Sequence, residues 1–173
     1  MRSALAVVFF ALVLAPVSSA AAPRWPNHSS TLGNRVDALG LHALPSEGAA
    51  EHIHAHLDVY VDGQRVTVPA LVGIDVPDQF ITELHTHDTT GIIHIESPDV
   101  RPFTLGQFFG EWNEPLSAKR LGSVSGAVHW WVNGKARTGD PAKLVLKAHA
   151  EIALAVGALP KRVPASYRFP FGY

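Results

Sequence analysis

The chain lacks cysteine, and its only methionine is Met1. Without cysteine there are no disulfides, so burial of a core, with or without a bound ion, has to stabilise the fold. The same absence excludes thiolate metal sites, and the lack of internal methionine excludes soft Cu(I)-type sites. Imidazole and carboxylate groups are the metal ligands that this sequence can offer.

Blocks of basic residues are absent as well. Lys and Arg number 14 against 15 Asp and Glu, for a formal net charge of −1. Because phosphate binding needs clustered Lys and Arg, we predict no nucleic-acid partner. The sequence also lacks a Gly-x-Ser-x-Gly elbow, a Gly-rich phosphate loop and a His-Glu-x-x-His motif, which argues against the enzyme classes built on them.

A long apolar run occurs only at the N-terminus. Residues 1–22 are predicted to be a secretory signal peptide: Arg2 supplies the positive start, Ala4 to Ala15 is apolar, and Ala20 to Ala22 offers small residues for cleavage. The run is too short to span a bilayer. We therefore expect a secreted or periplasmic protein with no membrane span.

The rest of the chain divides by composition. Residues 23–50 are rich in Pro, Gly, Asn, Ser and Ala without a sustained period, which predicts a linker or a loosely packed arm. Residues 51–173 are predicted to form a single, mainly β domain, an antiparallel sandwich or partly open barrel built from hairpins. One short helix is expected near residues 104–112, because Thr104 and Gln107 form a capping box and Phe103 and Phe108 a hydrophobic staple.

Several segments alternate with the period of a strand. In residues 52–61 the odd positions are all apolar, and the even positions are His52, His54, His56, Asp58 and Tyr60. Asp-Gly at 62–63 and Asn-Gly at 133–134 predict hairpin turns, the second within a hairpin over residues 123–138. Residues 144–156 read as another strand, and the tail from 160 to 173 is expected to lie extended over the sheets. Its predicted anchors are Tyr167, Phe169 and Phe171.

Residues 84–96 hold the main candidate site. Asp88 to Gly91 has turn chemistry, and Ile92 to Ile95 is rich in β-branched residues, so the segment predicts two strands around a turn. If the loop has an even number of residues, His85 faces His94 and Glu83 faces Glu96. An odd loop would separate these histidines, because a one-residue slip reverses the faces.

Histidines recur at the spacing that suits a metal site on strands. His-x-His occurs at 52/54, 54/56 and 85/87, and His94-x-Glu96 follows. Residues i and i+2 of a strand point the same way, about 7 Å apart, so two imidazoles can share an ion with a third from the next strand. A lone histidine on a polar face is more often simply solvated, as we expect for His28, His42, His129 and His149. The predicted ligands are His85, His87 and His94, with His54 or His56 from the neighbouring strand and Glu96 as a fourth ligand or an orienting partner.

Three functions remain open at this point. The first is binding of a divalent metal, with Cu(II) or Zn favoured by nitrogen-rich sites without sulfur, for buffering, delivery or sensing. The second is a three-histidine metalloenzyme, a hydrolase or hydratase, with Glu83 or Glu96 as proton acceptor. The third is a metal-free adhesion or assembly module whose histidines become charged below about pH 6.5.

Five motifs together resemble a group of exported bacterial proteins without an established activity. They are HIHAH at 52–56, LHTHD at 84–88, GIIHIESP at 91–98, FTLGQFF at 103–109 and WVNGK at 131–135. The resemblance spans roughly residues 51 to 173. It implies a domain of that size and an exported protein, and it implies no particular mechanism.

Overall fold

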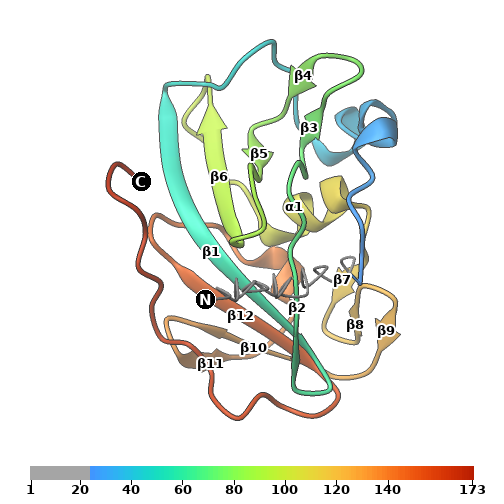
Figure 1. Ribbon diagram of the computed structural model, residues 1–173, viewed down its shortest axis with the longest axis vertical. Coiled ribbons are helices and arrows are strands. Elements are labelled where there is room, and N and C mark those ends of the chain that lie inside the picture. Colours follow the sequence, from blue (N-terminus) through green and yellow to red (C-terminus); the bar gives the residue numbers. More distant parts are fainter. Residues whose placement is uncertain (1–23) are drawn as a thin grey trace, which may run out of the picture.

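The computed structural model describes residues 24–173, so the predicted signal peptide lies outside the described residues. Its main element is a seven-stranded sheet in the order β11-β10-β12-β1-β6-β5, with β2 paired to β1 (Figure 1). Within the described residues the sheet is open, because its path ends at β11 and β5. The mainly β fold with one short α-helix is thus confirmed. In the same residues no helix is both long and apolar enough to cross a bilayer.

Strand β1 (Glu51–Val61) is the centre of the sheet. Its first half pairs antiparallel with β6 (Ile92–Ser97), and its second half pairs parallel with β12 (Glu151–Val156). Strand β2 (Gln64–Val66) returns antiparallel through the predicted turn, where Asp62 and Gly63 both have positive φ. The β1–β12 pair is parallel, and the other strand pairs of the described residues are antiparallel.

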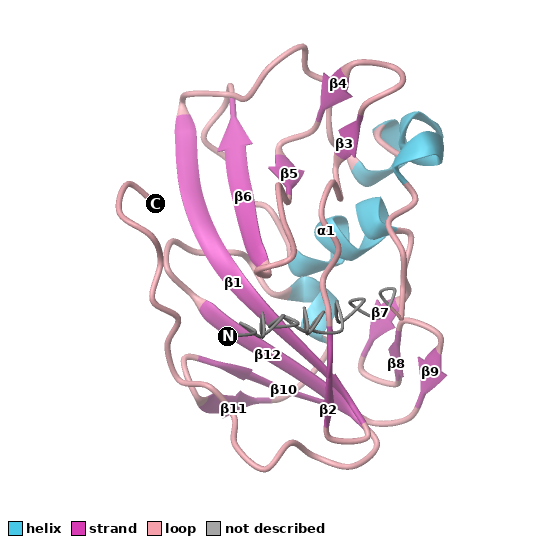
Figure 2. Cartoon of the chain, in the orientation of Figure 1, coloured by secondary structure: helices cyan, strands magenta, loops and turns pink. Residues whose placement is uncertain are grey.

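The other strands are short. Strands β10 (Val128–Val132) and β11 (Lys135–Arg137) form the predicted Asn-Gly hairpin, and β5 (Leu84–His85) lies beside β6. Two small sheets join β3 (Ile74–Asp75) to β4 (Phe80–Ile81), and β7 (Leu116–Ser117) to β8 (Arg120–Leu121) and β9 (Val124–Ser125) (Figure 2). Within residues 24–173, three 3₁₀ helices span Ser29–Asn34, Asp37–Leu39 and Pro141–Lys143.

Helix α1 (Leu105–Trp112) begins at the predicted cap. The Gln107 amide donates to Thr104 Oγ1 at 3.3 Å, and the Thr104 amide donates to Gln107 Oε1 at 2.8 Å. The helix ends at Asn113, which adopts a left-handed conformation. Phe108, Phe109 and Trp112 are buried in one core with the apolar face of β1, so the aromatic residues of this segment serve packing.

Removing this cap should weaken the fold measurably. We expect Thr104→Ala to lower the free energy of unfolding by about 1 kcal/mol, because the Gln107 amide loses its acceptor. Urea denaturation of the metal-free protein measures the change. Thr104→Ser keeps the hydroxyl and is the control; equal losses in both variants would show that the cap is not the cause.

The segment preceding β1 is not a loosely packed arm. Trp25, Leu32, Val36 and Leu41 are buried in the common core. Trp25 also packs edge-on against Trp112, with ring centroids 5.9 Å apart. The prediction was wrong because large apolar residues scattered without a period leave no strand or helix signal, although they can fill a core from irregular backbone.

Two predicted strands are shorter than expected. Strand β12 begins at Glu151 and not at residue 144, because His149 has a φ of +56° and turns the chain. The segment from 123 is interrupted at Gly126, which separates β9 from β10. In both places a local turn overrides the alternating pattern.

The C-terminal segment runs beside β12 and β1 (Figure 1, red). Tyr167 stacks on His56 with ring centroids 3.7 Å apart, and Phe169 lies 5.0 Å from the His149 ring. Phe171 is fully exposed, so it is not an anchor. Tyr173 takes that role, with its ring 4.6 Å from His54. The tail therefore covers the histidine face of β1, which the alternating sequence had left open to solvent.

Candidate metal centre

The turn between β5 and β6 sets the geometry of the centre. Leu84 pairs with Ile95 and His85 with His94, which confirms the register expected for an even loop. Gly91 is needed in this turn: its φ is +93°, and an added Cβ would lie 2.6 Å from the Leu57 carbonyl oxygen. The tight approach of this turn to β1 thus returns His94 to a position beside His85.

Three imidazoles gather at this point. Nitrogens of His85, His87 and His94 all lie within 4.8 Å of one another. The His85 and His94 rings are stacked at 5.1 Å, and the His87 ring stands edge-on to both, at 4.9 and 4.4 Å. Two nitrogens that bind one ion at about 2.0 Å each lie no more than about 4 Å apart. Small ring rotations would therefore suffice for a shared ion.

His85 presents a free lone pair to this group. Its Nδ1 donates to the Thr82 carbonyl oxygen at 3.0 Å, so its Nε2 carries no proton in the neutral ring. That Nε2 is buried and has no hydrogen-bond partner among residues 24–173. Burial lowers the pKa of His85 to about 3, so the ring is neutral at physiological pH. A neutral imidazole held with one nitrogen free is the form that binds metal.

Glu96 is hydrogen-bonded to His94, and one of its oxygens also lies within 4.8 Å of ligand atoms of His85 and Glu47. Its Oε1 accepts a hydrogen bond from His94 Nδ1 at 2.8 Å, which leaves Nε2 as the metal-binding nitrogen of that ring. Burial would raise the pKa of Glu96, but the bond to His94 and the charges of nearby histidines lower it to about 2. A carboxylate behind a histidine is the usual support for a metal ligand.

His54 lies at the edge of the group. Its Nε2 is 3.1 Å from His94 Nδ1 and 3.7 Å from Glu96 Oε1. Burial, followed by the charges of His94 and His52, lowers the pKa of His54 to about 4. With His52 and Glu96 it forms a second, overlapping set of groups that could hold an ion.

Glu47, which the sequence pattern did not predict as a ligand, joins the centre from the loop before β1. Its Oε1 lies 3.3 Å from His87 Nε2 and 3.9 Å from His85 Nε2. The loop approaches the end of β6 closely: a Cβ on Gly48 would lie 2.1 Å from the Ser97 carbonyl carbon. A carboxylate next to a glycine in an irregular loop carries no periodic signal, so this placement was not predictable.

Two other predicted residues lie apart from the three-histidine group. The ring of His56 is engaged at both nitrogens, Nδ1 with Glu151 Oε2 at 2.8 Å and Nε2 with the Thr90 carbonyl oxygen at 3.0 Å. Glu83 is fully buried and bonded to the amide and the ring of His42, at 2.9 and 2.7 Å. Arg101 donates to the same Glu83 carboxylate at 2.9 Å. His42, expected to be solvated, therefore has a structural partner.

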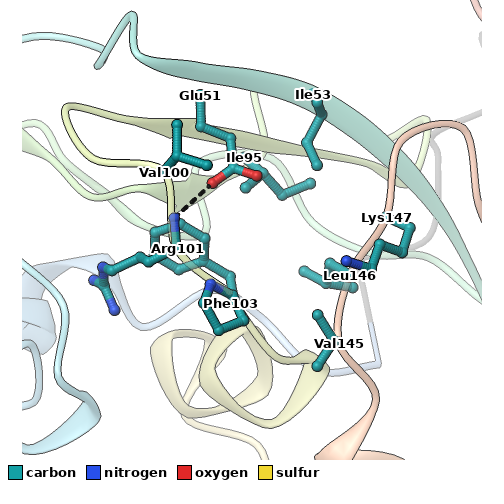
Figure 3. Close-up of a pocket in the computed structure, with 10 residues that line it drawn as sticks. Glu51, Ile53, Ile95, Val100, Arg101, Phe103, Val145, Leu146 and Lys147 are labelled. Carbon is teal, nitrogen blue, oxygen red and sulfur yellow. Dashed lines mark hydrogen bonds between the residues drawn. The ribbon is translucent and has the colours of Figure 1, made fainter.

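The opposite face of the sheet carries a different pocket. It has a volume of about 260 Å³, and Ile53, Ile95, Phe103 and Leu146 form much of its wall (Figure 3). Within it Glu51 accepts a hydrogen bond from the Arg101 amide at 3.3 Å. Because side chains alternate along β1 and β6, these isoleucines point away from His54 and His94. The pocket is therefore separate from the metal centre.

Comparisons with protein-family models, curated proteins and solved structures give no match for this chain. The resemblance of its motifs to an exported bacterial group stays a prediction.

Proposed function

We propose that this chain binds a divalent metal ion through His85, His87 and His94, with Glu47 as the fourth ligand. The observation that supports this most is the buried Nε2 of His85, which has no partner in the described part of the chain and faces two further imidazoles. Burying a polar atom without a partner costs about 1–3 kcal/mol, and a metal ion would remove that cost.

The donor set favours Zn(II) or Cu(II). Three imidazoles and one carboxylate, without sulfur, suit both ions. Glu96 would hold His94 in the binding orientation, and His54 and His52 lie close enough to take part in transfer of the ion. His87 and Glu47 are about half exposed and provide the route from solvent. Together with the predicted export, these features fit buffering, delivery or sensing of metal outside the cytoplasm.

Binding is better supported than catalysis. Glu83 is held by His42 and Arg101, and Glu96 is buried and hydrogen-bonded to His94. A general base has to reach the proton that it removes. Glu83 and Glu96 are 0 and 2 % exposed, so neither of these two carboxylates meets solvent beside the three imidazoles.

The proposal is tested by titrating metal-free, untagged protein with Zn(II) and with Cu(II) in a calorimeter. We expect His87→Ala to weaken binding at this centre by more than about 10-fold, because a ligand is lost without disturbing the core. Metal at 100 times its Kd should stabilise the wild type by about 2.7 kcal/mol. His129→Ala, on an exposed position of β10, is the control and should behave as the wild type. Unchanged binding in His87→Ala would remove this residue from the site and contradict the proposal. No binding by the wild type would favour a metal-free histidine patch.

A further inference from the structure

A second cluster of ligand-type side chains lies farther along β1. His56, Asp58 and Glu151 are buried, with exposed fractions of 2, 5 and 1 %. The parallel register places His56 opposite Glu151, and Asp58 follows His56 on the same face. One nitrogen or oxygen of each residue lies within 4.8 Å of the others. None of the three takes part in the proposed three-histidine centre.

The contacts of His56 require a proton or a metal ion between this ring and Glu151. Its Nε2 faces the Thr90 carbonyl oxygen, which can only accept, so that Nε2 carries a proton. Its Nδ1 lies 2.8 Å from Glu151 Oε2. In a neutral ring this Nδ1 has no proton, so its lone pair faces the lone pairs of a carboxylate oxygen. Either a proton or a metal ion has to lie between them.

The carboxylates have unused capacity for such an ion. Glu151 Oε1 is buried and lacks a hydrogen-bond partner within residues 24–173. Asp58 Oδ1 is paired with Arg65 at 2.6 Å, but the Arg65 side chain is 56 % exposed and can turn into solvent. Beside the cluster is a pocket of about 340 Å³, which Arg65, Ser166 and Tyr167 help to line. An ion can therefore reach the carboxylates by displacing a surface guanidinium.

We propose that His56 Nδ1, Asp58 and Glu151 form a second divalent-metal site, distinct from the three-histidine centre. The ion takes the place of the proton shared by His56 and Glu151, which is released to solvent, and displaces Arg65 from Asp58. One nitrogen and two carboxylates are a harder donor set than three imidazoles. The site therefore accepts Mn(II) as well as Zn(II). Tyr167, stacked on His56, fixes the plane of the ligating ring.

Zn(II) stoichiometry, measured by native mass spectrometry and calorimetry on the full mature chain, tests this proposal. We expect two equivalents for the wild type and one for Glu151→Gln, which keeps the size of the side chain but not its charge. His87→Ala should also bind one equivalent, and the double variant His87→Ala, Glu151→Gln should bind none. Two equivalents in Glu151→Gln would overturn the second site. If the wild type binds one equivalent and His87→Ala loses it, the second site is overturned and the three-histidine centre stands. If the wild type binds one equivalent and only Glu151→Gln loses it, the three-histidine centre is overturned and the second site stands.

Arg65→Ala gives an independent answer if Glu151→Gln does not fold. The Arg65 side chain is largely exposed and lies outside the apolar core, and its replacement removes the positive charge that competes with the ion for Asp58. We expect Arg65→Ala to bind Mn(II) about three- to tenfold more tightly than the wild type. The electron paramagnetic resonance signal of free Mn(II) measures this affinity. Unchanged or weaker Mn(II) binding in Arg65→Ala would overturn the proposal.

Discussion

Replacing His85 and His94 together by alanine is expected to weaken Zn(II) binding at the three-histidine centre by a factor on the order of 1,000. Loss of a partner behind a metal ligand already costs about 10- to 100-fold, and this variant removes two ligands themselves. The remaining groups, His87 and Glu47, are about half exposed and flexible. Competition with a chelator of known affinity measures the change over this range.

Two controls separate loss of ligands from loss of fold. His129→Ala removes an exposed histidine from the same sheet and should leave the affinity unchanged. Circular dichroism of the double variant should retain the wild-type β signature, because His85 and His94 lie on the face opposite the apolar core. Wild-type affinity in a folded double variant would remove these residues from the metal site.

The metal-free protein is expected to lose several kcal/mol of stability as the pH falls from 6.5 towards 4. The folded-state pKa is about 3 for His85 and about 4 for His54, against an ordinary value of 6.5. In that window the unfolded chain carries protons on both rings that the folded chain does not, so acid favours unfolding. Each pKa unit corresponds to about 1.4 kcal/mol. Below pH 4.5 the lowered pKa of Glu96 adds a loss of the same sign.

Urea denaturation in the presence of a chelator, at pH 7.5, 5.5 and 4.5, measures this dependence. His54→Gln should flatten the curve between pH 6.5 and 4, because the variant has no ring to protonate at that position. His129→Gln is the matched control and should keep the wild-type slope. A stability that is constant over this range, or a slope unaffected by His54→Gln, would contradict the burial of these rings.

The parts of the fold that depend on local chemistry were predictable. The turn residues Asp88 to Gly91 and the β-branched run after them determine the register that brings His85 and His94 together. The capping box at Thr104 likewise determines where α1 begins. In these places neighbours in sequence make the deciding contacts, so the residue pattern is sufficient.

The parts that depend on distant contacts were not predictable. Glu47 reaches the imidazoles because its loop packs on the end of β6. His56 is not part of the three-histidine group, because the parallel pairing of β12 with β1 places it opposite Glu151. His54 is buried because Tyr173 returns over it. The composition of the tail predicted that it lies over the sheets, but period and spacing describe one strand at a time and do not show which strand face the tail covers.

The most direct test of the proposed metal centre is a crystal structure of the Zn(II)-loaded protein with anomalous diffraction at the zinc absorption edge. We expect an anomalous peak about 2.0–2.1 Å from nitrogens of His85, His87 and His94. The proposed centre would be contradicted if crystals of the loaded protein showed no peak between these three rings while the rings were ordered and apart.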